Sequence, residues 1–230
     1  MDMAWRQTSR ERWLRRAQHA SDAFGLVLLL VLGTYALGSL VSNRNWGAVL
    51  LSAFTSATSI VALTSAHAKR TTVRRALPIA AAAVALALAG AISGGRGWVG
   101  LASLLEIGLL FVATGAVLRR VVSSTEVSFR TILGAVSVYA VLGILFTWAY
   151  GAIDRIEGGG FFEGVAHARG NDFIFFSYTT LTTTGYGNLV PAGHVGRMVA
   201  GLEMMAGQIF LVTLVAGLVA LWRPGRGVAR

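Results

Sequence analysis

The chain has 230 residues, of which 55% are hydrophobic and only 13% are charged, and its mean hydropathy is +0.65. A soluble domain carries roughly a quarter charged residues, and here the apolar residues fall in long blocks, so the composition excludes an ordinary soluble domain and indicates a membrane protein. The absence of cysteine excludes disulfides and thiolate metal sites, and the net charge of +10 is divided among separate loops, so we expect no nucleic-acid partner.

In chain order, the sequence begins with a basic segment, residues 1–20, in which five arginines are interleaved with two tryptophans. This composition is typical of a short helix lying on an anionic membrane surface. Apolar stretches follow, each close to the roughly 20 residues that cross a bilayer. The six stretches are residues 23–41, 46–66, 77–92, 98–118, 132–151 and 195–222. They predict an all-α integral membrane protein with six transmembrane helices.

Lysine and arginine alternate between loops that are rich and loops that are poor in them. Of the 20 basic residues, 15 lie in residues 1–20, 69–75, 119–130 and 223–230. The other five are Arg44, Arg96, Arg155, Arg169 and Arg197. Because basic residues concentrate on cytoplasmic loops, we expect a multi-pass protein of the cell (plasma or inner) membrane with both termini in the cytoplasm.

The fourth stretch contains one charged residue, Glu106. An ionisable group inside a span is a functional candidate, and here we expect a buried, protonated acid that is hydrogen-bonded to the second stretch. The hydroxyl-bearing candidates for its partners are Ser52, Thr55, Ser56 and Ser59.

The segment between the fifth and sixth stretches holds an aromatic run and a glycine motif. Asn171 or Asp172 is placed to cap a short helix over residues 173–181. Residues 182–188 then read Thr-Thr-Thr-Gly-Tyr-Gly-Asn. Glycines allow backbone conformations that other residues avoid, so successive carbonyls of such a segment can point the same way.

This Thr-x-Gly-Tyr-Gly motif, between a capped aromatic helix and a membrane span, resembles the selectivity filter of the tetrameric potassium channel family, in its bacterial six-transmembrane form without voltage-sensor arginines. The resemblance covers residues 131–222. It implies a re-entrant pore helix and a homotetrameric channel in the lipid bilayer, because one chain offers one filter segment and the family uses four. It also implies passive conduction of K⁺, with K⁺ ions in the filter and no cofactor.

The resemblance assigns roles to the filter residues. The carbonyls of Thr183, Thr184, Gly185 and Tyr186 would bind K⁺, the Thr183 hydroxyl would close the innermost site, and Gly187 would complete the filter. The Tyr186 ring would point away from the ions and contact aromatic side chains of the pore helix.

Four residues are expected to support the filter: Thr179, Thr180, Asn188 and Glu203. Glu203, near the outer end of the last span, is expected to hydrogen-bond behind the filter, to Thr179 or Thr180. Asn188 stands where aspartate is common in the family, and Thr179 where some members carry glutamate. Slow filter inactivation is therefore not carried over to this chain.

The sixth stretch carries further candidates. Gly207 falls where the family has an inner-helix glycine, and both a hinge and close helix packing are open for it. Gln208, Leu211 and Val215 follow at helical spacing and are predicted to line the cavity. His194, on the outer side, titrates near neutral pH when unperturbed and is a candidate external pH sensor.

The apolar stretches, the basic loops and the resemblance together divide the chain into five expected parts. They are a cytoplasmic basic segment (1–20), a four-helix transmembrane domain similar to a degenerate voltage sensor (21–120), a cytoplasmic linker (121–130), the pore domain (131–222) and a short cytoplasmic tail (223–230). A voltage sensor needs arginines at every third position of its fourth span, and residues 98–118 contain none. We therefore expect no steep voltage gating, and a gating role for Glu106 is the alternative to a buried acid.

Other functions predict other features. A weakly selective cation channel on the same fold often lacks the aromatic residue found here as Tyr186. A six-helix secondary transporter predicts internal repeats and several midplane charges, whereas the only central acids are Glu106 and Glu203. An enzyme is not expected, because no Ser/His pair or metal-ligand cluster lies within a span.

Overall fold

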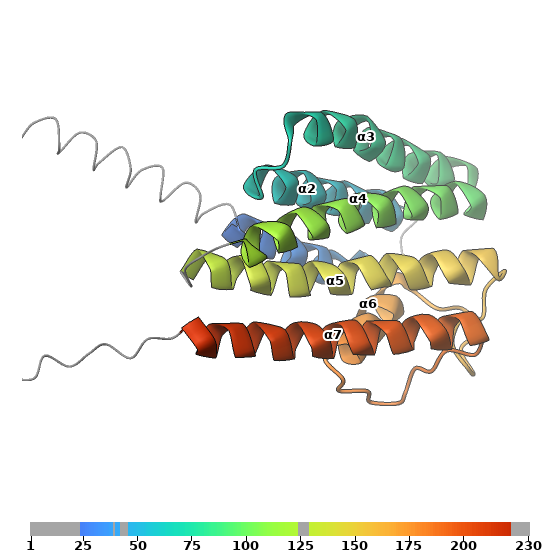
Figure 1. Ribbon diagram of the computed structural model, residues 1–230. Coiled ribbons are helices and arrows are strands. Elements are labelled where there is room, and N and C mark those ends of the chain that lie inside the picture. The colour runs from blue at the N-terminus through green and yellow to red at the C-terminus, as the bar shows by residue number, and fades with distance from the viewer. Residues whose placement is uncertain (1–23, 39, 42–45, 124–128, 222–230) are drawn as a thin grey trace, which may run out of the picture.

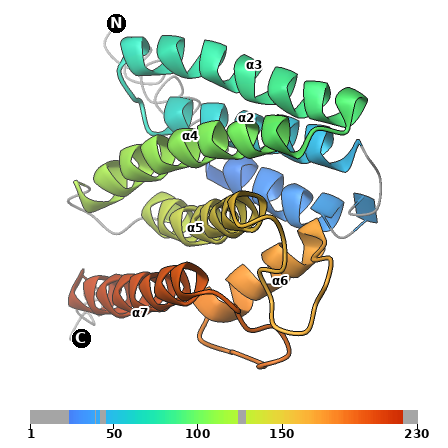
Figure 2. The same ribbon diagram turned by 90° about the vertical axis from the view of Figure 1, so that its right-hand side faces the viewer.

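The computed structural model describes residues 24–38, 40–41, 46–123 and 129–221, and in this part the chain is helical (Figure 1). The helices are Phe24–Gly38, α2 (Gly47–Ser65), α3 (Arg70–Ser93), α4 (Arg96–Val122), α5 (Phe129–Ile156), α6 (Gly170–Leu181) and α7 (His194–Leu221). The long helices lie side by side, and the shorter α6 lies between α5 and α7 near one end (Figure 2). The predicted basic segment 1–20 and the tail 223–230 are outside the described residues.

Five of the described helices are long and apolar enough to cross a membrane. They comprise Gly47–Ser65, Arg70–Ser93, Gly97–Val122, Thr131–Ile156 and His194–Leu214. The first predicted span coincides with the shorter apolar helix Phe24–Gly38. The expectation of an all-helical membrane protein is therefore confirmed, and the count of six spans stays a prediction.

Helix α3 begins earlier than the apolar stretch predicts, at Arg70 instead of residue 77. Arg74 and Arg75 therefore lie in helical turns and not in a loop, and both are exposed. Pro78 lies inside the helix, where it removes one backbone N–H donor, and its side chain is exposed. The apolar block marks the part of a helix that suits the bilayer, and the helix itself continues into the polar boundary.

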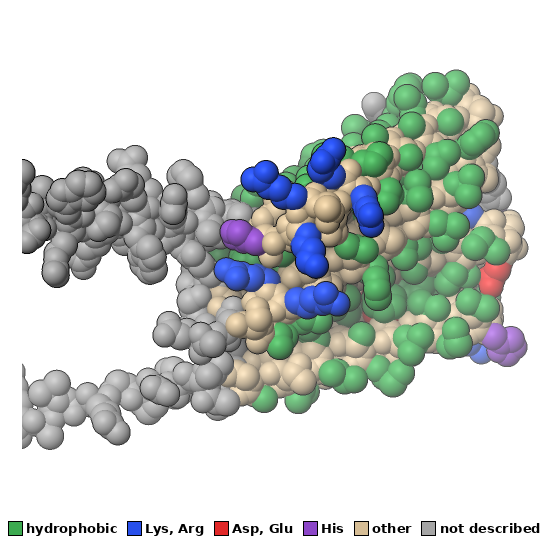
Figure 3. All heavy atoms as spheres, turned by 45° about the horizontal axis from the view of Figure 1, so that its top comes forward, with side chains coloured by type: hydrophobic (Ala, Val, Ile, Leu, Met, Phe, Trp, Pro, Cys, Tyr) green, Lys and Arg blue, Asp and Glu red, His purple; other side chains and the backbone are tan. Residues whose placement is uncertain are grey.

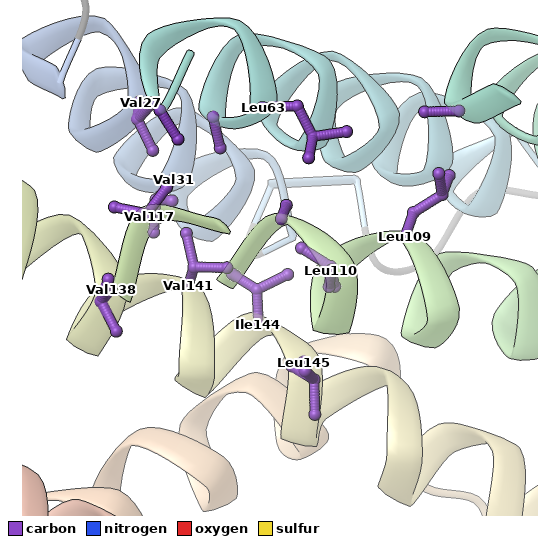
Figure 4. Close-up of a cluster of buried hydrophobic side chains, with 14 of the residues drawn as sticks. Val27, Val31, Leu63, Leu109, Leu110, Val117, Val138, Val141, Ile144 and Leu145 are labelled. Carbon is purple, nitrogen blue, oxygen red and sulfur yellow. The ribbon is translucent and has the colours of Figure 1, made fainter. Parts of the chain in front are cut away.

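Helix α5 joins two packed units, because it contacts α4 on one side and α6 and α7 on the other. The core of the first unit is built mainly from aliphatic side chains of the helix Phe24–Gly38, α2, α4 and α5 (Figure 4), and Ala76 and Ala80 of α3 also belong to it. Those labelled in the figure are Val27, Val31, Leu63, Leu109, Leu110, Val117, Val138, Val141, Ile144 and Leu145. Lipid is as apolar as these side chains, so close packing and not escape from water holds the unit together.

The second unit has a largely aromatic core between α5, α6, the loop after α5 and the first turns of α7. Its buried members are Tyr150, Phe161, Phe162, Phe173, Phe176 and Ala200. The loop is fastened to the segment that follows residue 188: Phe162 forms an antiparallel bridge with Pro191, and the Ala192 amide donates to the Phe161 carbonyl at 2.8 Å. These contacts hold the loops on both sides of α6 in one position.

Exposed basic side chains gather at one end of the molecule (Figure 3). They come from the α2–α3 connection, the start of α3 and the end of α4: Lys69, Arg70, Arg74, Arg75, Arg119 and Arg120. The helix Phe24–Gly38 begins and α7 ends at this same end, whereas the loops around α6 lie toward the other (Figure 1). This is the charge distribution that the sequence predicts, and the side of the membrane that each end faces stays a prediction.

Glu106 on α4 is fully buried against α2. Its Oε1 atom accepts hydrogen bonds from the hydroxyls of Ser52 at 2.6 Å and Ser56 at 2.9 Å. The prediction is thus correct for two of the four candidate partners. Thr55 instead accepts a hydrogen bond from the indole of Trp148 on α5 at 3.2 Å, and the Ser59 hydroxyl has no partner among the described residues. The bond between Thr55 and Trp148 links the four-helix part to α5.

Glu106→Ala is expected to lower the stability of the four-helix part by about 1–3 kcal/mol, because two buried serine hydroxyls lose their shared acceptor. Glu106→Gln keeps an oxygen at that position and is expected to cost clearly less. Thermal unfolding of the two variants in the same detergent measures the difference. Equal midpoints for both variants would show that the Glu106 oxygen contributes nothing to this contact.

Candidate functional site

Helix α6 is the element that positions the glycine motif. It begins at Gly170, with Arg169 in the N-cap position, and the Asp172 carboxylate accepts a hydrogen bond from the Arg169 amide at 2.8 Å. Asp172 therefore stabilises the start of the helix from its first turn, whereas Asn171 or Asp172 was expected in the cap position itself. A carboxylate in the first turn also suits the positive end of the helix dipole.

The residues after α6, here called the glycine segment (182–188), fold back onto the end of this helix. The amides of Thr184 and Gly185 both donate to the Thr179 carbonyl, at 2.9 and 3.1 Å, and the Thr183 amide donates to the Thr180 carbonyl at 2.9 Å. The last carbonyls of a helix lack partners within the helix, and these amides supply them. Thr179 and Thr180 therefore support the segment through their backbone.

These bonds set the direction of the carbonyls. In a trans peptide the C=O group points opposite to the N–H group of the next residue. Since the amides of Thr184 and Gly185 point back to α6, the carbonyls of Thr183 and Thr184 point away from it. Two neighbouring carbonyls are thus presented on the side of the segment that faces away from the helix.

The backbone of the glycine segment alternates in handedness. Thr183, Gly185 and Gly187 have positive φ values of 55°, 50° and 75°, and the residues between them do not. A side-chain-bearing residue pays roughly 1–2 kcal/mol for such a conformation, which explains glycine at two of the three positions. Alternation of this kind keeps successive peptide groups pointing to the same side.

The glycine segment lies on the surface of the single chain. All residues from 182 to 188, including Asn188, are exposed, and Tyr186 is 70% exposed. The Tyr186 ring stacks on Phe175 of α6, with centroids 5.8 Å apart and planes at 10°. This is the contact with an aromatic side chain of α6 that the sequence predicts.

Helix α7 contributes one polar contact to this segment, at Thr183. The Gln208 amide donates to the Thr183 hydroxyl at 2.9 Å, and that hydroxyl donates to the Thr182 carbonyl at 2.7 Å. Leu211 follows on α7 and is partly exposed, whereas the Val215 side chain lies outside the described residues. His194 is the exposed first residue of α7.

Gly207 lies where α7 crosses the end of α6. A Cβ atom at this position would clash with the Leu181 carbonyl oxygen, which is a backbone atom. The same oxygen accepts a hydrogen bond from the Tyr139 hydroxyl of α5 at 3.0 Å. Close packing is thus a sufficient reason for glycine here, and the hinge stays a prediction.

Glu203 is fully buried, and its partners differ from those predicted. Its carboxyl oxygens contact the Ser177 hydroxyl and the Tyr150 hydroxyl, each at 2.5 Å. The Thr179 hydroxyl instead donates to the carbonyl of Phe176 within α6, at 3.0 Å. Ser177 lies earlier on α6 than either predicted threonine, so Glu203 supports the body of the helix and not its end.

Comparison with known proteins supports the functional class of this part of the chain. Residues 138–222 match a family model described as ion channel, and the match covers most of α5 together with α6, the glycine segment and α7. These residues therefore form an ion channel domain, and the match supports passive ion conduction as the class of activity of this part of the chain. No curated protein and no solved structure matched the chain.

Proposed function

We propose that the chain is a potassium-selective channel in which the glycine segment forms the selectivity filter. The observation that carries the proposal is the pair of amides on the Thr179 carbonyl, because it turns the Thr183 and Thr184 carbonyls away from α6. Rings of such carbonyls replace the hydration shell of K⁺. The alternating backbone continues through Gly185 and Gly187, which supports further sites at Gly185 and Tyr186.

The proposed channel is a homotetramer. Backbone carbonyls at membrane depth are tolerated only where they are buried in protein or line water, and in one chain the glycine segment is exposed. Four copies around a closed axis would enclose it. Exposed apolar side chains on α7, among them Met198, Leu202, Met205 and Ile209, supply surface for neighbouring copies. Native mass spectrometry of the detergent-solubilised protein tests the number of chains.

The proposed channel is not steeply voltage-gated. One charge that crosses the full membrane potential supplies about 2.3 kcal/mol per 100 mV, and α4 carries Glu106 alone between its two ends. Arg119 and Arg120 lie in its last turn, at the membrane boundary in the proposed orientation. A current whose open probability rises steeply over tens of millivolts, and which is lost in Glu106→Gln, would contradict this part of the proposal.

Ion flux into proteoliposomes tests conduction itself. We expect K⁺ to enter passively, driven by its own gradient, and Na⁺ to be excluded. Comparable entry of Na⁺ and K⁺ would instead indicate the weakly selective cation channel. Flux that requires the gradient of a second ion would indicate a secondary transporter.

A further inference from the structure

Helices α5, α6 and α7 meet at a buried hydrogen-bonded group that consists of Tyr150, Ser177 and Glu203, one residue from each helix. None of the three side chains is accessible to solvent. The Tyr150 hydroxyl lies 2.5 Å from Glu203 Oε2, and the Ser177 hydroxyl lies 2.5 Å from Glu203 Oε1. The Ser177 hydroxyl also lies 2.8 Å from the Gly143 carbonyl of α5.

The number of protons in this group determines the direction of its hydrogen bonds. A serine hydroxyl has one proton to donate, and the Ser177 oxygen has two oxygen neighbours. The Gly143 carbonyl can only accept. If Ser177 donates its proton there, the contact with Glu203 needs a second proton, and the Glu203 carboxyl group is the only member of the contact that can carry it.

The surroundings of Glu203 favour a neutral group. In the described part of the chain, the titratable groups of the packed helices that interact electrostatically with Glu203 are tyrosines: Tyr139 and Tyr150 of α5 and Tyr178 of α6. Among the described residues, the basic side chain nearest to it on its own helix, Arg197, pairs with Glu163 in the surface loop. An uncompensated charge buried at membrane depth is costly.

We propose that Glu203 carries a proton on Oε1 and donates it in a hydrogen bond to Ser177, which in turn donates to the Gly143 carbonyl. The chain of bonds runs from α7 through α6 to α5, and Tyr150 completes it by donating to Oε2. Ser177 and Tyr150 are thereby positioning residues: they fix the body of α6, whose last turn holds the amides of the glycine segment. An effect of this hydrogen-bonded group on conduction rests on the proposed channel function. The protonation of Glu203 does not depend on that function.

Glutamine reproduces the proposed pattern of donors and acceptors. Its side-chain NH₂ can donate to Ser177, and its oxygen can accept from Tyr150. We therefore expect Glu203→Gln to keep ion flux within about twofold of the parent chain, and Glu203→Ala to lose about tenfold or more, because buried hydroxyls lose their partners. A tenfold loss in Glu203→Gln, with Glu203→Ala no worse, would contradict the proposed pattern.

Infrared difference spectroscopy of the full-length protein in lipid membranes at neutral pH tests the proton directly. We expect a C=O stretching band of a protonated carboxyl group that shifts in heavy water. It should be lost in Glu203→Gln and kept in Glu106→Gln, the matched variant of the other buried acid. Loss of a carboxylate band in Glu203→Gln, with every protonated-carboxyl band retained, overturns the proposal.

A second variant keeps the test decisive if Glu203→Gln fails to assemble. Ser177→Ala removes the acceptor of the proposed bond but leaves Glu203 in place, so the protonated-carboxyl band should move to higher frequency. An unchanged band in Ser177→Ala means that Glu203 does not donate to Ser177. The infrared results do not depend on ion flux, so a protein with the expected band and no K⁺ flux would refute the channel proposal alone.

Discussion

Gly185→Ala is expected to abolish K⁺ conduction while the chain still folds and inserts into membranes. Gly185 has a φ of 50°, and no atom of the same chain lies close to the position where a Cβ would be. The expected loss of conduction therefore comes from the backbone, since this conformation costs an alanine roughly 1–2 kcal/mol in every subunit. A relaxed backbone would withdraw the Gly185 amide from the Thr179 carbonyl and turn the Thr184 carbonyl out of line.

Gly164 provides the matched control for this variant. It also has a positive φ, of 73°, with open space around it, but it lies in the loop before α6. Gly164→Ala should have a similar conformational free-energy cost but keep most of the K⁺ flux. The measurement is flux into proteoliposomes that contain equal amounts of assembled protein. Equal losses in both variants would mean that strain as such, and not the glycine segment, limits conduction.

Gly207→Ala is expected to destabilise the contact between α6 and α7 by about 1–3 kcal/mol, the usual cost of an extra methyl group in a packed interior. The new methyl group would clash with the Leu181 carbonyl, which is held by Tyr139 and cannot rotate away as a side chain could. We expect a lower thermal midpoint of the assembled protein together with reduced flux, because the end of α6 carries the glycine segment.

Gly201, on the same helix, provides a control variant that distinguishes a packing role of Gly207 from a hinge role. Within one chain a Cβ at Gly201 would meet no atom within 4 Å, so Gly201→Ala should leave the contact between α6 and α7 intact and should not lower the thermal midpoint through it. If Gly207 acts only as a hinge, its alanine variant should keep the parent midpoint and change only the fraction of time that single channels are open. Single-channel recording and thermal unfolding of both variants distinguish these roles.

The helices of this protein follow from its sequence because a bilayer requires long apolar blocks, and the predicted blocks and the observed helices largely coincide. The start of α3 is the exception. Arg70, Arg74 and Arg75 indicated a loop, and Pro78 stood close to the start of the apolar block. Arginine is a good helix former, so the chain continues as a helix through this polar boundary.

The candidate site divides into a part that is local in sequence and a part that is not. The conformations of Gly185 and Gly187, and the stacking of Tyr186 on a ring of α6, depend on neighbouring residues, and both agree with the sequence-based expectation. The partners of Glu203 depend on how α7 is rotated and shifted against α6. Adjacent residues of a helix point about 100° apart, so counting along the chain does not identify its neighbour.

Ser177 and Tyr150 left a weaker signal that could have been used. Each is a polar residue within an apolar segment, and buried polar groups find hydrogen-bond partners. The candidate partners of Glu106 include both correct and wrong predictions. Ser52 and Ser56 lie one turn apart and share the face that meets it, whereas Thr55 lies to the side and contacts Trp148.

The reversal potential of the current in planar bilayers, with K⁺ on one side and Na⁺ on the other, tests potassium selectivity most directly. With purified protein we expect a current that reverses near the equilibrium potential of K⁺ and follows it when the K⁺ gradient is changed. A reversal potential near zero under these opposed gradients would contradict potassium selectivity and assign the glycine segment to a pore that passes both cations.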